Sequence, residues 1–421
     1  MRNARAGAQS HEEGTARRLT GSYSLRLALF FSALFAVTGT KLPYLPVWLD
    51  WRGLTNAEIA IVTAAPLFLR IIAGPLIALA ADRWGDRRQA AVALAALALV
   101  GAALLAVAFG FWSILVVVLI GALAAMGLMP IAETLAMSGV RRGGLDYGRM
   151  RLWGSVSFIA IGFAAGPAIV AFGASSVLWF LVAGSFATFV SALMLPADPD
   201  ADQEQGQARE QAQGRRPTFA LLAASQFTPR FLLFLAGAAA VQSSHAVFYT
   251  FGVIEWQRQG VSATWCATLW AIGVAVEIGL FAFSKVAVAR LGAIGLLMTG
   301  AVAGVIRWAA MAFDPPLAAL IPLQALHGLT FGAAHLGALH FMSANVPPSE
   351  AATAQAVYAS VTSGIGLGLA TLAAGPLYGA LGGYAYAPMA LLCVAGTIGT
   401  VWLSRWPKST VTVRVDESSA R

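Results

Sequence analysis

Long uncharged stretches dominate the pattern of polar and apolar positions along this chain. No Asp, Glu, Lys or Arg occurs within residues 89–132, 152–197 or 351–404. Each stretch is about twice the roughly 20 residues that one membrane-spanning helix needs. Each therefore predicts two helices joined by a tight turn. We expect these turns at Phe111–Trp112, Phe172–Ser176 and Gly379–Gly383.

Single apolar segments account for the other spans, and they are continuous rather than alternating, which favours helices over barrel strands. Composition agrees, because 58% of the residues are hydrophobic, 11% are charged and the mean hydropathy is +0.74. A soluble domain has about a quarter charged residues. The prediction is an all-α integral membrane protein with twelve transmembrane helices. The single spans are expected at about 25–48, 57–80, 230–253, 262–284, 292–311 and 316–341.

The basic residues fall mainly on one side of the predicted membrane. Of the 27 Lys and Arg residues, 22 lie in the terminal tails or in the loops after spans 2, 4, 6 and 8. Only Arg52 and Arg258 lie on the other side. The positive-inside rule then predicts a multi-pass protein of the cytoplasmic (inner) membrane with both termini in the cytoplasm. This bias accounts for the net charge of +8, so nucleic-acid binding is not indicated.

The chain divides into two similar halves. A polar segment over 196–228 predicts a cytoplasmic linker between six-helix halves at 24–195 and 229–405, with cytoplasmic tails at 1–23 and 406–421. Ala164–Pro167 and Ala373–Pro376 share the sequence Ala-Ala-Gly-Pro, 209 residues apart. Two weaker matches occur at nearly the same offset, and both copies run in the same direction across the membrane. The halves are therefore predicted to be a parallel repeat.

Twelve spans, this repeat and the loop Ala81–Arg88 resemble the major facilitator superfamily. The loop is similar to the signature G-x-x-x-D-R-x-G-R-R, with Ala78 in place of the first glycine. The resemblance implies a gating loop containing Asp82, Arg83, Gly85, Arg87 and Arg88. The chain further resembles the oligosaccharide:proton symporter-like branch, being closer to 3-phenylpropionate permease than to lactose permease. The segments that carry this resemblance are Lys41–Leu49, Pro130–Ala136, Leu145–Ser155, Gln242–Tyr249 and Leu326–Phe331.

Charged side chains within the predicted spans are the candidate functional residues, because each costs about 2.5–3.5 kcal/mol at the bilayer centre. Two acids are predicted to be embedded, Glu133 and Glu277. The bases are Lys41, Arg70 and Arg307, with Arg151 at the start of span 5. The alternative is that these groups only pair to hold helices together.

The resemblance to lactose permease suggests roles for several of these residues. Glu133 and Arg151 match its sugar-binding acid–arginine pair, and Phe158 takes the place of its stacking aromatic. Glu277, Arg307 and His327 match its acid, arginine and histidine of spans 8, 9 and 10, and form the expected proton-coupling group. Thr330 replaces its proton-carrying glutamate, so Glu277 is the expected proton carrier.

Charge balance favours an anionic solute. Lys41, Arg70, Arg151 and Arg307 give four cations against two acids, and arginine binds carboxylates bidentately. The predicted substrate-binding residues are Lys41, Arg70, Glu133, Arg151, Phe158 and His245. Alternatively, Lys41 extends to the membrane surface and Arg70 bonds to helix carbonyls.

The sequence therefore predicts a secondary active transporter that works by alternating access, with proton-coupled uptake of a small organic, aromatic acid. A sugar or nucleoside symporter remains an alternative, as does a non-transporting membrane sensor. No set of residues suggests enzyme chemistry, a metal site or a cofactor. The expected partners are the solute, protons and the lipid bilayer, and the protein is expected to be a monomer.

Overall fold

The computed structural model describes residues 2–84, 86–143, 145–196, 228–347 and 350–406, and within these ranges every regular element is a helix. Most of the predicted linker and of the C-terminal tail, at 197–227 and 407–421, lies outside the described residues. The same holds for Gly85 of the predicted gating loop and for the side chains of Asp82 and Arg83.

The first half contains six helices, one for each predicted span. They are α1 (Arg2–Trp51), α2 (Asn56–Trp84), α3 (Arg87–Leu104), α4 (Gly110–Gly143), α5 (Tyr147–Phe172) and α6 (Ser176–Leu193). Helix α1 begins within the segment predicted as a polar tail, but its apolar, membrane-spanning part begins at Ser22.

In the second half, some spans are single helices and others are each divided between two shorter helices. These are α9 (Pro229–Ser243), α10 (Ala246–Arg258), α11 (Ala263–Ala282), α12 (Ser284–Met311), α13 (Leu317–Ala325), α14 (Ala334–Asn345), α15 (Ala351–Ala359), α16 (Leu367–Leu381) and α17 (Tyr386–Arg405). The π-helical turns Gly328–Ala333 and Ser360–Gly366 join α13 to α14 and α15 to α16. Such turns are frequent at functional sites.

Twelve spans result. Eleven stretches are long and apolar enough to cross a membrane, and the last of them, Thr353–Arg405, has 53 residues. At 1.5 Å per residue it would be ~80 Å long, more than twice the ~30 Å hydrocarbon layer. The chain reverses within it at Gly382, whose φ of +57° favours glycine. The twelve-helix prediction is confirmed.

One turn lies earlier than predicted. The sequence places the reversal between the third and fourth spans at Phe111–Trp112, but α3 ends at Leu104 and α4 begins at Gly110. The φ of Gly110 is +72°, in the left-handed region that glycine tolerates. Hydropathy could not locate this turn, because its residues are as apolar as the helices that flank it.

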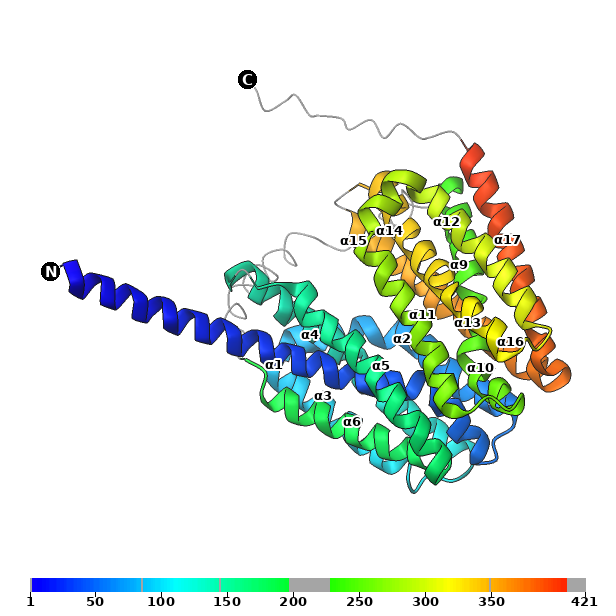
Figure 1. Ribbon diagram of the computed structural model, residues 1–421, viewed down its shortest axis with the longest axis horizontal. Coiled ribbons are helices and arrows are strands. Elements are labelled where there is room, and N and C mark those ends of the chain that lie inside the picture. The colour runs from blue at the N-terminus through cyan, green and yellow to red at the C-terminus, as the bar shows by residue number, and fades with distance from the viewer. Residues whose placement is uncertain (1, 85, 144, 197–227, 348–349, 407–421) are drawn as a thin grey trace.

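The two halves meet at one end of the molecule and separate toward the other. A shared hydrophobic core contains Tyr44 and Trp48 of α1 together with Phe248 and Trp256 of α10. Near the opposite end each half has a core of its own, around Phe30 and Phe31 in the first half and around Phe234 in the second. Figure 1 shows the halves meeting near α10 and α16 and diverging toward α4 and α15. We call the first region the closed end and the second the open end; the charge distribution predicts that the open end is cytoplasmic.

The repeated Ala-Ala-Gly-Pro motif makes close backbone contacts between the halves at the closed end. A Cβ atom on Gly166 of α5 would lie 2.8 Å from the carbonyl oxygen of Ala263 at the start of α11. The equivalent Gly375 of α16 would place its Cβ 2.7 Å from the carbonyl oxygen of Asn56 at the start of α2. Both contacts lie between the halves and involve backbone, which cannot easily move. The two copies of the motif therefore make equivalent seals across the closed end.

Enlarging one of these glycines should open the closed end. Gly375→Leu forces α16 away from α2 at a cost of about 1–3 kcal/mol, which shifts the equilibrium between conformations roughly five- to 150-fold. The measurement is the labelling rate of a cysteine at Thr38, an exposed residue that lines the central cavity. An impermeant maleimide is applied from the closed-end side of a protein in which Cys266 and Cys393 are serine.

Labelling should be faster in Gly375→Leu than in the parent. Gly279→Leu is the control, because a Cβ there meets nothing within 4 Å. Equal labelling rates for Gly375→Leu and the parent would contradict the seal.

Candidate functional site

A cavity of about 480 Å³ lies beneath the closed end. It is lined by α1, α2, α3, α4 and α6 of the first half, and by Tyr249, Thr250, Leu367 and Thr371 of the second. Most lining side chains are apolar. Of the described residues that line it, Lys41 alone carries a charge.

Prolines shape the wall of this cavity. Pro46 of α1 and Pro66 of α2 both line it. Each lacks an N–H, so the carbonyl four residues earlier, on Leu42 or Val62, loses its usual helical partner. Leu42 and Val62 also line the cavity. Two helix carbonyls of residues that line the cavity therefore lack their usual helical partner.

Lys41 has no counter-ion in the part of the chain that the structure describes, where no carboxylate lies within ion-pair distance of its ammonium group. An unpaired ammonium group in a largely apolar cavity is costly. An anion that enters the cavity would supply the missing partner.

Arg70 lies outside the cavity lining. Pro66 and Leu67 of α2 line the cavity, and Arg70 follows them by about one helical turn on the same face. Its side chain is exposed. The structure thus places Lys41 on the cavity wall and Arg70 beyond it, toward the open end.

Glu133 and Arg151 do not form an ion pair in this conformation, although Glu133 is near enough to act electrostatically on Arg151. The Arg151 guanidinium instead lies 4.0 Å from the centre of the Phe35 ring. Asp146 caps α5 by accepting from the Arg149 amide, which sets the start of the helix that carries Arg151. Glu277 acts on the same guanidinium from the opposite half.

Phe158 faces the other half rather than the cavity. It packs against the shared core, and its ring centre lies 6.4 Å from that of Trp270 on α11. It is not among the described residues that line the cavity.

The second half contains a fully buried polar network around Arg307. One terminal nitrogen donates to Nδ1 of His327 and to Oγ1 of Thr330, both at 3.1 Å, and the other donates to Oε1 of Gln324 at 2.7 Å. The guanidinium also lies over the rings of Phe248 and Trp308, at 4.7 and 4.3 Å. These contacts replace the water that an arginine normally needs.

The network determines the proton position on His327. Arginine can only donate, so Nδ1 of His327 must accept, and the ring proton is on Nε2. Nε2 lies 3.9 Å from Oε2 of Glu277, which is partly exposed. The structure therefore brings Glu277, His327 and Arg307 into one chain of contacts, running from an accessible carboxylate to a buried cation.

His245 belongs to this network and not to the cavity lining. It is fully buried, with Nε2 3.1 Å from Oγ1 of Thr330 and Nδ1 3.2 Å from the carbonyl of Gln242. Tyr249, whose ring stacks on His245 at 5.4 Å, lines the cavity. Tyr249 thus connects the cavity with the network.

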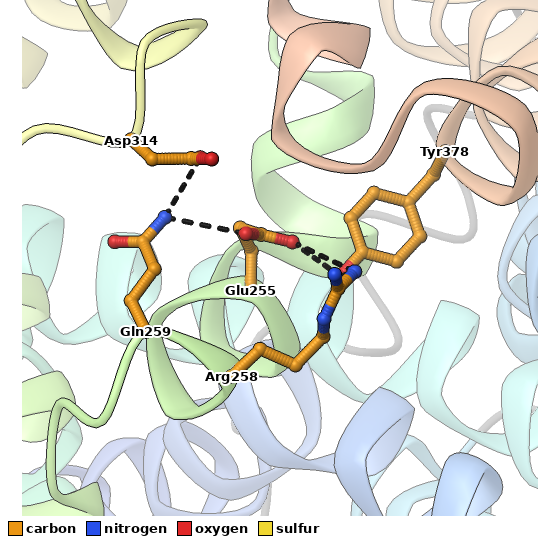
Figure 2. A network of polar contacts seen from close by, with 5 residues as sticks. All are labelled: Glu255, Arg258, Gln259, Asp314 and Tyr378. Carbon is orange, nitrogen blue, oxygen red and sulfur yellow. Dashed lines mark hydrogen bonds and ion pairs between the residues drawn. The ribbon is translucent and has the colours of Figure 1, made fainter.

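One buried acid, Glu255, was not among the predicted embedded residues. Glu255 is 4% exposed, and its Oε2 accepts from the Tyr378 hydroxyl at 2.6 Å and from Arg258 at 3.3 Å. Gln259 connects its Oε1 to Asp314 (Figure 2). The predicted seventh span ends at residue 253, but α10 continues to Arg258. The apolar run ends before Glu255, so hydropathy gave no signal for this extra helical turn.

The described part of the predicted gating loop caps a helix. Asp86 caps α3 by accepting from the amides of Arg88 and Gln89. Arg88 donates to the carbonyl of Leu193 at the end of α6, at 2.6 Å. Arg87 also has an interaction partner. The loop therefore ties α3 to α6 at the open end.

Comparison with known families accounts for this architecture. The model of the MFS_1-like family matches residues 23–386, most of the chain. The chain belongs to this family of the major facilitator superfamily. It is 34% identical over 374 residues to the probable 3-phenylpropionic acid transporter of Escherichia coli K12, covering 87% of this chain and 94% of that protein. It is 31% identical to the maltose permease of Geobacillus stearothermophilus, covering 83% and 86%.

Solved structures of other major facilitator transporters share the fold. The nucleoside transporter NupG superposes with a TM-score of 0.78 at 18% identity, covering 91% of this chain and all of that one. A D-xylose–proton symporter gives 0.65 at 14% identity, covering 92% and 98%. This MFS_1-like protein is a multi-pass membrane transporter of a small solute.

Asp314, which accepts a hydrogen bond from Gln259 beside Glu255, makes the stability of this MFS_1-like protein depend on pH. The pKa of Asp314 is raised above its ordinary value, chiefly by partial burial and also by the nearby Glu255 carboxylate. The folded protein then binds a proton more tightly than the unfolded chain does. Stability should fall as the pH rises from about 4, the ordinary Asp value, through the raised pKa.

Asp314→Asn removes this titration and keeps the acceptor for Gln259. Asparagine also tolerates the residue's φ of +48°. In thermal melts in detergent between pH 3.5 and 7, the wild type should lose melting temperature relative to the variant as the pH rises. Parallel profiles, or a relative gain by the wild type, would contradict the prediction.

Proposed function

We propose that this transporter carries a small organic acid with an apolar, aromatic body into the cytoplasm together with protons. The observation that carries the proposal is Lys41, an ammonium group without a counter-ion on the wall of a mainly apolar cavity. A carboxylate would neutralise Lys41, and an apolar body would fit the remaining wall. We place the protein in the cytoplasmic membrane with both termini inside, following the charge distribution.

The cavity suits an amphipathic acid better than a sugar. Several lining hydroxyls already donate to carbonyls of their own helices, including those of Thr38, Thr63 and Thr188. A sugar needs many hydrogen bonds from the wall, whereas an aromatic acid needs one cation and apolar surface. The relative named as a probable 3-phenylpropionic acid transporter supports this choice. The maltose permease keeps a sugar as the second candidate.

Proton coupling suits an anionic solute. A monoanion that enters against an inside-negative potential is opposed by ~2.3 kcal/mol per 100 mV, and one accompanying proton cancels its charge. Glu277 is our proposed proton carrier, because its carboxylate is partly exposed and borders the Nε2–H of His327.

The position of Glu277 suggests how the proton acts on the conformation. Glu277 of α11 and Arg151 of α5 belong to different halves and attract each other electrostatically. Both lie near the open-end termini of their helices. An ionised Glu277 therefore favours closure of the open end, and its protonation weakens that attraction. Under this proposal a protonated carrier opens to the cytoplasm, and loss of the proton there favours the return.

Replacing Lys41 should discriminate against the charged form of the solute. Lys41→Met removes a charge-assisted contact, so affinity for 3-phenylpropionate should fall about tenfold or more, while affinity for its neutral amide changes little. Binding to purified protein is the measurement. Arg70→Gln is the comparison, and should have a smaller effect, because Arg70 lies beyond the cavity lining.

Equal losses for acid and amide would show that Lys41 is structural. Saturable uptake of maltose or a nucleoside that is unchanged in Lys41→Met would favour a sugar or nucleoside symporter.

Replacing Glu277 should separate transport from energy coupling. Glu277→Gln cannot release a proton, so accumulation driven by a pH gradient should be lost, while exchange of labelled for unlabelled solute continues. Both are measured in proteoliposomes, with Glu58→Gln at the start of α2 as the control. Accumulation that persists in Glu277→Gln would assign the proton to another group, such as Glu133 or His327.

A further inference from the structure

A second pocket lies at the closed end of the first half, away from the central cavity. It is lined by Trp51 at the end of α1 and Arg52 directly after it, by Ala106 of the turn after α3, and by one face of α6. The α6 residues run from Leu178 through Val182 to Phe186, which at 1.5 Å per residue is ~12 Å along the helix. The pocket thus continues from the end of the helix bundle along the side of α6.

The aromatic residues around this pocket place it at a membrane surface. Trp51 and Trp179 line it and are 54% and 56% exposed, and Phe186 is 56% exposed. Exposed tryptophans concentrate where lipid headgroups meet the hydrocarbon layer. The Arg52 end therefore lies at headgroup level, and Phe186 lies deeper, beside the acyl chains.

Arg52 forms no ion pair with any described residue. One terminal nitrogen donates to the carbonyls of Leu105 and Ala106, at 3.2 and 3.0 Å. Its Nε is buried without a hydrogen-bond partner. Among the described residues no carboxylate lies within ion-pair distance of it. The guanidinium lies over the rings of Trp48 and Phe109, at 4.9 and 4.5 Å.

The internal repeat provides a direct comparison. Arg258 follows Arg52 by 206 residues, close to the 209 that separate the Ala-Ala-Gly-Pro motifs, and it ends the equivalent span. Arg258 has Glu255 at 3.3 Å as its counter-ion. The residue 206 positions before Glu255 is Leu49, which is buried and apolar. The second half supplies its own anion at this position, and the first half does not.

We propose that this pocket binds a membrane phospholipid, with the phosphodiester on Arg52 and an acyl chain along α6. A phosphate at headgroup level is the anion that the surroundings of Arg52 lack. Leu178, Val182 and Phe186 give the acyl chain an apolar path from that level toward the bilayer centre. Neither the solute nor the proton pathway is involved.

Native mass spectrometry of the purified transporter tests this site with added phosphatidylglycerol. Arg52→Gln should weaken retention of the lipid about tenfold, because it removes a charge-assisted contact. Since Arg52 also holds the turn after α3, a second variant leaves it intact. Ala183→Trp fills the pocket from an exposed position on α6 and should also displace the lipid.

Two controls match these variants. Arg258→Gln removes the equivalent cation of the other half, and Ala187→Trp adds the same bulk to an exposed residue one turn farther along α6, outside the lining. Both should retain lipid as the wild type does. Wild-type retention in both Arg52→Gln and Ala183→Trp would overturn the site.

Two analogues of the lipid test whether the pocket needs both the phosphate and the acyl chains. Diacylglycerol, which lacks the phosphate, and glycerophosphate, which lacks the acyl chains, should each bind the wild type much more weakly than phosphatidylglycerol. Equal binding of diacylglycerol would show that Arg52 is not a ligand. Equal binding of glycerophosphate would show a site for soluble anions. Either result would overturn the proposal.

Discussion

The cost of an unpaired charge or hydrogen-bonding group in the bilayer governs the rest of this structure. Helices satisfy the backbone within each span. The few charged side chains then need partners, water or a ligand. Arg307 obtains three side-chain acceptors and two aromatic rings. Glu255 obtains a hydroxyl, an arginine and an amide. Lys41 and Arg52 have no acidic partner within the described residues. At these two positions we propose that a bound molecule supplies the anion.

Close contact between the halves depends on the absence of side chains. Gly166 and Gly375 let helix backbones approach at the closed end, where a methyl group would collide with a carbonyl oxygen. Small residues commonly permit such approach between membrane helices, which gain little from hydrophobic burial in lipid. A contact of this kind depends on shape, so it can be made and broken without exposing charge. That property suits the alternating-access mechanism that the sequence predicts, in which this interface must separate.

The sequence predicted the spans well and the site only in part. Membrane helices have a strong hydropathy signal, so all twelve were found, and the Ala-Ala-Gly-Pro repeat indicated the two halves. The signal is weak at turns and helix ends. The turn before Gly110 was misplaced, and the predicted seventh span stopped at residue 253, before Glu255. The sequence indicated how deep each charged residue lies in the membrane, but not whether its side chain faces the cavity. Lys41 and Arg70 looked alike in the sequence, yet only Lys41 lines the cavity. The predicted partners Glu133 and Arg151 are separate in this conformation; Arg151 packs on Phe35, a contact with no sequence signature.

The repeat preserved geometry while the chemistry of the halves diverged. Equivalent glycines seal both sides of the closed end, and equivalent arginines end spans 1 and 7. The buried polar network around Arg307 belongs to the second half, whereas most of the cavity and Lys41 belong to the first. Tyr249 connects them, because it borders the cavity and stacks on His245 of the network. If, as we propose, the first half holds the solute and the second half holds the proton, the two can act together only when the halves meet. Under the proposed function, that division would make the movement of the two halves depend on both solute and proton.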